Sequence, residues 1–345
     1  MRAPLRMWRK RGTLARLLWP ASVLYAAGRA MARATYRLGL KRPQRVGVPV
    51  VVVGNLYVGG TGKTPLVIEL VSLLKKRGWH PGVVSRGYGG AARVPRLVTA
   101  GSRASDCGDE PLLIAAATGA PVAIGRDRVA AARLLRTMHP SCDVLIADDG
   151  LQHRRLARDF EVALIHGRGL GNGWLLPAGP LREPARRLEE VDAVVFNGPI
   201  QPVRIFSPFF FLRTEVTETY CLARPERRGS LQSLAQKQEK GGLRVLAACG
   251  IGTPESFFGM LHDRGLRFRT LALPDHYGYR RNPFPRHGVD MILITEKDAV
   301  KCRGDHALAH DERLWVVPLR ASLDRALTDL IDTRLRNAGN GSKAA

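Results

Sequence analysis

The feature that most constrains the fold is a glycine-rich segment that joins a short apolar run to a stretch with helical spacing. Residues 49–53 are a β-branched run between two glycines, which is typical of a strand buried on both faces. Residues 64–76 then repeat apolar side chains at helical intervals. Between them the chain reads Gly54-Asn-Leu-Tyr-Val-Gly-Gly-Thr-Gly-Lys-Thr64. A strand, a glycine-rich loop and a helix in this order predict a phosphate-binding loop.

The residue types of this loop suit nucleotide phosphates. Small residues let backbone N–H groups turn toward an anion, the lysine reaches the β- and γ-phosphates, and a threonine hydroxyl binds Mg²⁺. One residue departs from the usual pattern, because Tyr57 stands where such loops carry their first glycine. We predict that ATP, with Mg²⁺, is bound by Tyr57, Val58, Gly59, Gly60, Thr61, Gly62, Lys63 and Thr64.

A second apolar run, at 144–147, ends in Asp148-Asp149-Gly150. A buried strand that ends in acid is typical of the element that holds Mg²⁺ beside a phosphate loop. Because the carboxyl ends of parallel strands meet at one edge of a sheet, we expect the acids and the loop to lie together. Thr64, Asp148 and Asp149 form the predicted metal site. Adjacent strand residues face opposite ways, so one of the two carboxylates is expected to meet the metal, with the choice open. A solvated Asp-Asp-Gly turn is the alternative.

Alternating strand and helix patterns predict an α/β fold for the first 200 residues. Residues 46–204 are expected to form a P-loop NTPase-like core, a mostly parallel sheet flanked by helices. Its further strands are predicted at 82–85, 121–124, 144–147, 162–166 and 193–197, and its further helices at 110–118, 127–138 and 184–190.

The pattern changes after residue 204. Residues 205–221 are rich in Phe, Val and Thr and predict an extended ribbon, while 232–242 are polar and predict a loop, so 205–242 is interpreted as a linker. We expect a smaller C-terminal α/β domain over 243–345. Its elements are predicted as strands at 243–248, 291–295 and 314–317, a helix at 253–264 and a closing helix at 322–335.

The first 45 residues contain twelve Lys or Arg and no acid. Arg29, Arg33, Arg37 and Lys41 are four residues apart and form one basic stripe on a helix, beside apolar and aromatic residues. The apolar stretch at 17–28 is too short to span a bilayer. We predict an amphipathic helix over 1–45 that lies in a membrane interface, with its basic residues facing anionic headgroups. The alternatives are a helix packed on its own domain and an Arg-rich transit peptide.

The whole chain has 54 Lys plus Arg against 30 Asp plus Glu, a formal net charge of +24. Such a charge favours an anionic partner, which can be a nucleic acid, a phosphorylated substrate or an anionic lipid surface. The five cysteines have neither metal-ligand spacing nor paired spacing, so we expect reduced, buried thiols rather than a disulfide framework or a zinc site.

Further motifs, together with the loop and the acidic pair, make the sequence similar to a known family, the tetraacyldisaccharide 4'-kinases (LpxK family) of lipid A synthesis. The resemblance covers most of the chain, and the Tyr57 departure is shared by the family. The additional motifs are Ser85-Arg-Gly-Tyr-Gly89, Gly108-Asp-Glu-Pro111, Gly150-Leu-Gln-His153, Gly171-Asn-Gly173, Leu176-Pro-Ala-Gly-Pro-Leu-Arg-Glu183, Asp275-His-Tyr277 and Thr295-Glu-Lys-Asp-Ala-Val-Lys301.

The resemblance implies a kinase that moves the γ-phosphate of ATP to the 4'-hydroxyl of an acylated glucosamine disaccharide 1-phosphate, forming lipid IVA. It also implies a peripheral location at the cytoplasmic face of the bacterial inner membrane. By the same resemblance Asp109 is the acid that acts on the sugar hydroxyl and His276 is its partner. With Lys63 and Asp149 they are the predicted catalytic residues. A carboxylate can accept the proton of a hydroxyl as phosphoryl transfer proceeds, which fits these assignments.

Substrate contacts are predicted for residues near these motifs. Arginine suits bidentate phosphate binding, and Gln152 and His153 directly follow the acidic pair. The alternatives are a solvated surface position for any single arginine and a merely left-handed turn at Asn172. The predicted substrate-binding residues are Arg86, Tyr88, Gln152, His153 and Asn172, and Arg126, Arg128, Arg154 and Arg155 are further candidates for phosphate contacts.

Two other classes of function fit parts of the sequence. A GTP-dependent switch would need a guanine-reading motif, which Thr295-Glu-Lys-Asp298 resembles only superficially, with its lysine one position late. A nucleic-acid-binding ATPase would explain the charge, but the sequence carries no stacking-aromatic motif or nucleic-acid-binding signature. We therefore expect no nucleic acid partner.

Overall fold

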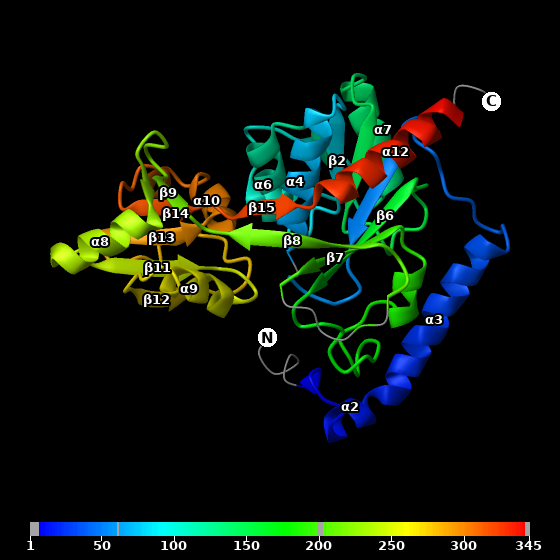
Figure 1. The fold of residues 1–345 in the computed structure, drawn as a ribbon, viewed down its shortest axis with the longest axis horizontal. Helices are drawn as coiled ribbons and strands as arrows, with labels where there is room; N and C mark the ends of the chain where they lie inside the picture. Colours follow the sequence, from blue (N-terminus) through cyan, green and yellow to red (C-terminus); the bar gives the residue numbers. More distant parts are fainter. Residues whose placement is uncertain (1–6, 61, 199–202, 204, 342–345) are drawn as a thin grey trace.

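The chain folds into two α/β units that lie side by side, with a long helix along one flank of the larger unit (Figure 1). The fold is that of a computed structural model, which describes residues 7–60, 62–198, 203 and 205–341. Thr61, one of the predicted nucleotide-binding residues, lies outside them. The larger unit holds a nine-stranded sheet and the smaller unit a six-stranded sheet. The predicted α/β class, with a mostly parallel sheet flanked by helices, is confirmed.

The nine-stranded sheet has the order β15-β8-β7-β6-β1-β5-β2-β4-β3 and is parallel except for its two edge strands. Every residue of its central strands β1 and β5 is buried, which is why these strands read as continuous apolar runs. The strands are β1 (Val50–Gly54), β2 (Pro81–Ser85), β3 (Arg96–Val98), β4 (Val122–Ile124), β5 (Val144–Asp148), β6 (Phe160–His166), β7 (Ala193–Asn197), β8 (Phe209–Glu215) and β15 (Arg320–Leu323).

Helices cover both faces of this sheet, because each presents one apolar stripe to it. Leucines of α4 meet Leu327 and Ile331 of α12 in a single apolar cluster on one face. That face carries α4 (Lys63–Lys76), α6 (Asp109–Thr118), which follows the short α5 (Ala104–Cys107), and α12 (Arg325–Gly341). The other face carries α7 (Arg128–Met138) and a 3₁₀ helix (Ala185–Glu189) where the sequence predicts a helix over 184–190.

The smaller unit is built on a sheet of order β10-β9-β14-β13-β11-β12. Its strands are β9 (Glu218–Cys221), β10 (Arg228–Ser230), β11 (Val245–Cys249), β12 (Arg269–Ala272), β13 (Met291–Thr295) and β14 (Leu314–Val317). Its helices are α8 (Leu231–Gly241), α9 (Pro254–His262), α10 (Glu296–Cys302) and α11 (His306–Ala309).

One prediction for the linker is wrong, because residues 232–242 are mostly the helix α8 rather than a loop. The Ser230 side chain caps this helix by accepting from the Ser233 N–H, 3.0 Å away. Leu231 and Leu234 then bury one face of the helix against the smaller sheet. The extended ribbon predicted over 205–221 is divided between β8 of the large sheet and β9 of the small one.

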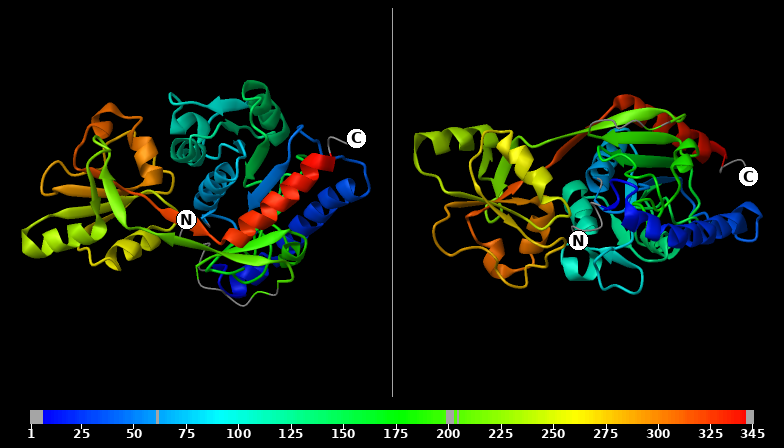
Figure 2. Two further views of the ribbon diagram at one scale, coloured as in Figure 1. Left: turned by 45° about the horizontal axis from the view of Figure 1, so that its top comes forward. Right: turned by 90° about the horizontal axis from the view of Figure 1, so that it is seen from below.

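The end of the chain also departs from the predicted division at 243–345, because it returns to the larger unit. β15 pairs antiparallel with β8, with Arg320 opposite Glu215, and α12 then packs beside α4. Figure 2 shows α12 lying along the large unit in both views. The apolar spacing identified a helix correctly, but its buried partners are leucines of the first domain, which local sequence does not specify.

The N-terminal segment forms α2 (Thr13–Leu17) and α3 (Trp19–Arg37), and the first two residues of its basic stripe face the protein. Arg29 lies 2.8 Å from the Glu183 carboxylate, and Arg33 pairs with Glu190. For Arg29 and Arg33 the predicted orientation toward headgroups is wrong, because acids of the large unit attract them inward. Arg37 and Lys41 are exposed, so for them the orientation stays a prediction. The described part of the chain contains no helix that is both long and apolar enough to span a membrane.

Candidate active site

The glycine-rich loop runs from the carboxyl end of the central strand β1 into α4. Gly62 has a φ of 90°, and a Cβ there would lie 2.2 Å from the Asn197 side chain, so the turn requires glycine. Lys63 begins α4, and its buried ammonium lies 3.3 Å from Oδ1 of Asn55. Thr64 is buried next to it. The loop thus directs a helix N-terminus and a cation to one place, as an anion site requires.

The residues before the turn differ in what they offer. The Tyr57 side chain is buried in the apolar core, and this burial raises the pKa of its hydroxyl. The Val58 N–H donates to the Pro180 carbonyl at 2.9 Å and so ties the loop to a neighbouring segment. Gly59 and Gly60 are exposed, and nothing described lies within 4 Å of a Cβ built on either. The tip of the loop is open.

Asp149 lies between two cations at the end of β5. Lys63 Nζ is 3.3 Å from its Oδ1, and Nη1 of Arg182 is 3.0 and 2.9 Å from its two oxygens. Burial alone would raise the pKa of Asp149, but Lys63 and Arg182 outweigh burial and lower the pKa to about 2. Its φ of 50° is unusual outside glycine and turns the backbone sharply as the strand ends.

Asp148 has a different environment, although it is the adjacent residue. Its Oδ2 accepts from Ser85 Oγ at 2.9 Å, while its buried Oδ1 receives no hydrogen bond from any described residue. Burial and the nearby Glu110 raise the pKa of Asp148 to about 6, against the lowering effect of Lys63. A buried carboxylate oxygen that the protein leaves without a donor suits a hard cation such as Mg²⁺.

Asp109 and His276 come from different units and meet at the boundary between them. Asp109 is the first residue of α6 and is buried, and Nδ1 of His276 lies 3.2 and 3.0 Å from its two carboxylate oxygens. His276 has a φ of 58°, which side-chain-bearing residues seldom adopt. The ring of Tyr88 lies 5.7 Å from the His276 ring, centre to centre.

Further charged residues surround this pair. Lys297, on α10 of the small unit, forms an ion pair with Glu110 of α6, and buried Lys301 lies 3.8 Å from Oδ2 of Asp109. Burial alone would raise the pKa of Asp109, but the His276 hydrogen bond and the charges of Lys297, His276 and Lys301 lower it to about 2. The hydrogen bond to Asp109 in turn raises the pKa of His276. The contact with Asp109 therefore favours the protonated form of His276.

The predicted substrate residues lie in several different places. Gln152 belongs to the Asp149 cluster, since it donates to the Asn55 carbonyl at 3.1 Å and accepts from Arg182 at 3.4 Å. Tyr88 is exposed beside the Asp109–His276 pair, and Arg86 is exposed with its charge close to that of Arg128. Asn172 is instead buried in its own loop, where its amide donates to the Ala178 carbonyl at 2.9 Å.

His153 and three of the candidate arginines have the following surroundings. Burial lowers the pKa of His153 to about 4, so this imidazole is neutral at neutral pH. Arg128 is buried near Asp148 and Asp149 and donates to the Gly125 carbonyl at 3.0 Å. Arg154 and Arg155 are ion-paired with Glu183 and Asp127 respectively.

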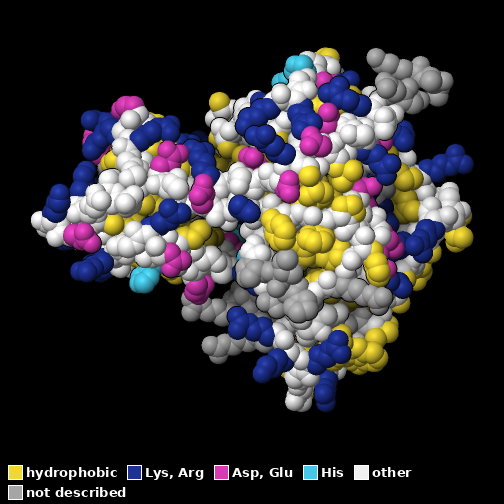
Figure 3. Space-filling view, in the orientation of Figure 1, with side chains coloured by type: hydrophobic (Ala, Val, Ile, Leu, Met, Phe, Trp, Pro, Cys, Tyr) yellow, Lys and Arg dark blue, Asp and Glu magenta, His cyan; other side chains and the backbone are white. Residues whose placement is uncertain are grey.

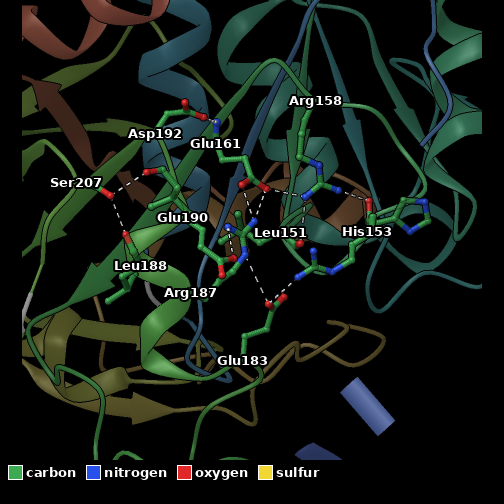
Figure 4. A network of polar contacts seen from close by, with 12 residues as sticks. Leu151, His153, Arg158, Glu161, Glu183, Arg187, Leu188, Glu190, Asp192 and Ser207 are labelled. Carbon is green, nitrogen blue, oxygen red and sulfur yellow. Dashed lines mark hydrogen bonds and ion pairs between the residues drawn. The ribbon is translucent and has the colours of Figure 1, made fainter. Parts of the chain in front are cut away.

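A buried network of charged residues contacts the loop that follows the acidic pair (Figure 4). Arg187 contacts Glu161 at 2.6 Å and lies 3.6 Å from Glu183, which also pairs with Arg29 of α3. Arg158 joins Glu161 to the carbonyls of Leu151 and His153, and so fixes the loop that follows the acidic pair. The loop after β5 is therefore held by several arginines rather than by apolar packing alone.

Sequence reasoning missed several charged residues of the site. Arg182 and Glu110 stand inside motifs quoted above, as do Lys297, Asp298 and Lys301 on α10, yet no role was predicted for any of them. The contacts Arg182–Asp149, Lys297–Glu110 and Lys301–Asp109 each join residues more than 30 positions apart in the sequence, so only the fold reveals them. The signal that was present is the place of these charged residues inside the motifs that carry the family resemblance.

The superficial guanine-reading motif has another function in the fold. Thr295 caps α10, and Asp298 is fully buried in the small unit, where both carboxylate oxygens accept from the Gly250 N–H. Neither residue is available to read a base at the phosphate loop. This finding removes the only sequence support for a GTP-dependent switch.

Comparison with known proteins gives a consistent result. The family model described as LpxK, tetraacyldisaccharide-1-P 4'-kinase, matches residues 14–336. The chain is 50% identical over 329 residues to tetraacyldisaccharide 4'-kinase of Janthinobacterium sp. (strain Marseille), covering 95% of this chain and 94% of the relative. It is 49% identical over 338 residues to the enzyme of that name from Herminiimonas arsenicoxydans, covering 96% and 94%.

A solved structure agrees with these sequence matches. The crystal structure of LpxK from Aquifex aeolicus in complex with ATP superposes with a TM-score of 0.79 at 30% identity, covering 94% of this chain and all of the other. The resemblance identified from the motifs is thereby confirmed. This chain belongs to the LpxK family of tetraacyldisaccharide-1-P 4'-kinases.

Proposed function

We infer that the chain is an ATP-dependent kinase that transfers the γ-phosphate to the 4'-hydroxyl of tetraacyldisaccharide 1-phosphate, forming lipid IVA. Family membership carries the reaction class. The observation that carries the site is the arrangement of Lys63, Asp149 and the Asp109–His276 pair, with Glu110 electrostatically linking the two clusters. Phosphoryl transfer depends mainly on positioning and on neutralising charge, and these residues supply both.

The phosphate loop holds ATP through backbone N–H groups at the start of α4 and through Lys63. Thr64 and Asp148 are the residues that would hold Mg²⁺, because Asp148 Oδ1 is buried without a described donor and Asp149 already has two cations. When bound there, Mg²⁺ would neutralise charge on the β- and γ-phosphates. This choice gives the adjacent acids separate roles: Asp148 toward the metal, Asp149 toward the lysine.

Asp109 receives the proton of the 4'-hydroxyl. The hydroxyl oxygen forms a bond to the γ-phosphorus, the bond from that phosphorus to the β–γ bridging oxygen breaks, and ADP leaves. His276 orients the carboxylate by its hydrogen bond and holds it ionised before the reaction. A carboxyl group of such low pKa is a weak base, so the proton moves late, once the attacking oxygen has become acidic.

The acceptor sugar lies at the boundary of the two units, next to the exposed Tyr88, with exposed Arg86 two residues earlier in the chain. An aromatic ring suits the face of a sugar, and the arginine suits a phosphate. His276 of the small unit already meets Asp109 in this structure, and closure of that unit over the bound acceptor would exclude water that could otherwise hydrolyse ATP.

The N-terminal helices dock the kinase on the cytoplasmic face of the bacterial inner membrane. Leu17, Leu24, Met31 and Leu38 are seven residues apart and form one row, and each is at least 68% exposed. Figure 3 shows hydrophobic side chains gathered on the flank where α3 lies. Because Arg29 and Arg33 face the protein, the outward face of α3 before Arg37 is largely apolar, which suits insertion among lipid acyl chains. The acceptor would then reach the site with its acyl chains still in the bilayer.

One assay tests the reaction directly. The protein is incubated with labelled ATP, Mg²⁺ and tetraacyldisaccharide 1-phosphate in mixed micelles, and the lipid fraction is analysed for a doubly phosphorylated product. We expect product with ATP, little with GTP, and none with Asp109→Ala. Absence of product from the wild-type protein under lipid-supplemented conditions would refute the proposed function.

A further inference from the structure

Polar contacts beneath His276 form a closed ring that crosses between the two units. The His276 N–H donates to the Gly250 carbonyl at 3.2 Å, and the Gly250 N–H donates to both oxygens of Asp298 at 3.2 and 3.1 Å. Lys301 Nζ lies 3.1 Å from Oδ1 of Asp298 and 3.8 Å from Oδ2 of Asp109. Asp109 completes the ring by its contact with the His276 ring at 3.0 Å.

Two members of the ring lie on α10, which packs against α6 of the large unit. Asp298 is 0% exposed, and its Oδ2 also accepts from Thr295 Oγ at 2.7 Å. Lys301 is 7% exposed, and its ammonium lies 5.5 Å from the centre of the Tyr279 ring. Burial of a charged pair stabilises a fold weakly, because desolvation offsets most of the attraction between the charges. Stability alone therefore does not account for a buried Asp298–Lys301 pair at this position.

Gly250 leaves the ring no spare room. A Cβ at this position would lie 3.1 Å from Asp298 Oδ1, 3.2 Å from the Pro274 carbonyl oxygen and 3.2 Å from Tyr277 Cβ. Gly250 follows β11 directly, and its two backbone groups face Asp298 and His276 respectively. The peptide at Gly250 thus transmits the position of Asp298 to the backbone of His276.

The backbone of His276 needs such support, since its φ of 58° is a conformation that residues with a Cβ adopt only when their surroundings enforce it. The other groups that face the imidazole are Asp109 of α6, Asp275 at 3.8 Å, the Tyr88 ring, and Lys297 of α10 through its charge. These groups act on the ring of the side chain. Among the described residues, Gly250 alone accepts a hydrogen bond from the His276 N–H.

We propose that Asp298 is a positioning residue that holds His276 against Asp109 through the Gly250 peptide, and that Lys301 is the counter-charge that closes this ring onto Asp109. The proposal rests on the roles given to Asp109 and His276 above. It assigns a function to the Thr295–Lys301 motif, which the phosphate chemistry alone does not use. Neither residue touches ATP or the acceptor; both act through the Asp109–His276 pair.

The first test replaces Asp298 by Asn, which keeps the shape and removes the charge. NMR titration of the His276 imidazole in the unliganded protein reports its contact with Asp109 without any need for turnover. We expect the pKa of His276 to shift toward its ordinary value by about half a unit or more. We expect kcat to fall at least about tenfold with the KM for ATP unchanged. The matched control is Asp305→Asn, which alters a capping aspartate of α11 in the same unit.

The second test changes no charge. Gly250→Ala places a methyl group against Asp298 and should reproduce both effects, and it also decides the question if Asp298→Asn does not fold. Its control is Gly259→Ala, since a Cβ on Gly259 of α9 meets nothing within 4 Å. Wild-type His276 titration and wild-type kcat in Gly250→Ala, or in a folded Asp298→Asn, would overturn the proposal.

A third variant separates positioning from stability. Asp298→Leu with Lys301→Met replaces the buried pair by apolar side chains of similar volume. Unlike the removal of one charge alone, this double change can keep the melting temperature at the wild-type value. Positioning predicts that kcat stays at least about tenfold low in this folded double variant. A merely structural ion pair predicts that kcat recovers together with stability, and that result would contradict us.

The controls for the proposed function keep the two failures apart. Asp109→Ala and His276→Ala test the catalytic pair by turnover alone. If both keep near-normal kcat, the assigned chemistry is wrong, while the titration of His276 in Asp298→Asn still reports whether the ring positions the imidazole. If both lose activity and the titration in Asp298→Asn and Gly250→Ala matches the wild type, the chemistry stands and the ring proposal fails.

Discussion

Nη1 of Arg182 contacts both carboxylate oxygens of Asp149, at 3.0 and 2.9 Å, while Lys63 approaches Oδ1 at 3.3 Å. Two cations share one carboxylate, so Asp149 cannot bind Lys63 as tightly as it would alone. Arg182 thereby leaves the lysine available for the phosphates of the nucleotide. The arginine comes from a segment that follows the acidic pair by more than 30 residues, which ties that segment to the phosphate loop.

Replacing Arg182 by Met should therefore weaken the use of ATP. Without the arginine, Lys63 is the one described residue left in ion-pair contact with Asp149 and is withheld from the phosphates. We expect kcat/KM for ATP to fall by about tenfold or more, measured in the mixed-micelle assay. Arg186→Met, an exposed arginine of the adjacent 3₁₀ helix, is the control and should behave as the wild type. Equal kinetics for the two variants would show that Arg182 has no such role.

Asp109→Asn should abolish turnover while sparing nucleotide binding. The amide cannot accept the hydroxyl proton and loses the ionic contact with His276, but it lies apart from the phosphate loop residues. We expect kcat to fall at least about a hundredfold, with ATP affinity from calorimetry unchanged within about twofold. Asp106→Asn, one turn earlier on α5, is the control. Turnover near the wild-type level would remove Asp109 from the catalytic role.

The Asp109–His276 pair predicts a specific pH dependence of stability. The pKa of His276 is raised, so its contribution is complete below about pH 6.5 and is lost as the pH rises through the folded value. The pKa of Asp109 is lowered from 3.8 to about 2, so its contribution is complete above pH 3.8 and is lost on further acidification.

The difference in unfolding midpoint between wild type and His276→Gln should thus be largest between about pH 3.8 and 6.5 and shrink above it. Urea unfolding across pH 4 to 9 measures this difference, with His80→Gln, an exposed histidine paired with Asp143, as the control. A difference that grows as the pH rises would contradict the pairing.

Asp148→Asn should raise the Mg²⁺ requirement. The buried Oδ1 without a described donor is the feature that suits a cation, and an amide binds Mg²⁺ more weakly than a carboxylate. We expect the Mg²⁺ concentration for half-maximal activity to rise about tenfold or more. Asp143→Asn, just before the opposite end of β5, is the control. An unchanged Mg²⁺ requirement would transfer the metal role to another residue.

The apolar row of α3 should govern membrane binding. Leu24→Asp with Met31→Asp places two charges on the outward face, which an acyl layer disfavours strongly. We expect flotation with anionic liposomes to decrease severalfold while ATP affinity is unchanged. Leu330→Asp makes the same kind of change at an exposed leucine of α12 and should leave flotation intact. Flotation that persists in the α3 variant would indicate another membrane-binding surface.

The parts of the fold that the sequence predicts well are those with a local physical cause. β1 and β5 are buried on both faces and read as apolar runs, and the phosphate loop needs glycines and Lys63 at fixed spacing. The helix α12 was recognised by its periodicity, but its partners were not, because they lie in α4 far away in sequence. Arg29 and Arg33 of the basic stripe face inward for the same reason: Glu183 and Glu190 attract them, and spacing alone does not reveal these partners.

The site divides in the same way. Lys63, Thr64 and the acids that end β5 follow from motif chemistry, and the Asp109–His276 pair followed only from the family resemblance. Arg182 escaped, because its partner lies on another element. Residues 232–242 were predicted as a loop on polarity alone, although Ser230 and the leucines after it carry a cap and an apolar stripe.

The pairing of Glu215 with Arg320 makes the smaller unit, in topological terms, the tip of a β-hairpin. Residues 216–319 leave the large sheet along β8 and return along β15, so a whole domain occupies the place of a turn. The outgoing strand β8 and the returning strand β15 are neighbours in one antiparallel ladder, so backbone hydrogen bonds hold the two connections to each other. A rotation that carries His276 toward or away from Asp109 therefore bends β8 and β15 together, and the stiffness of this two-stranded connection resists the rotation.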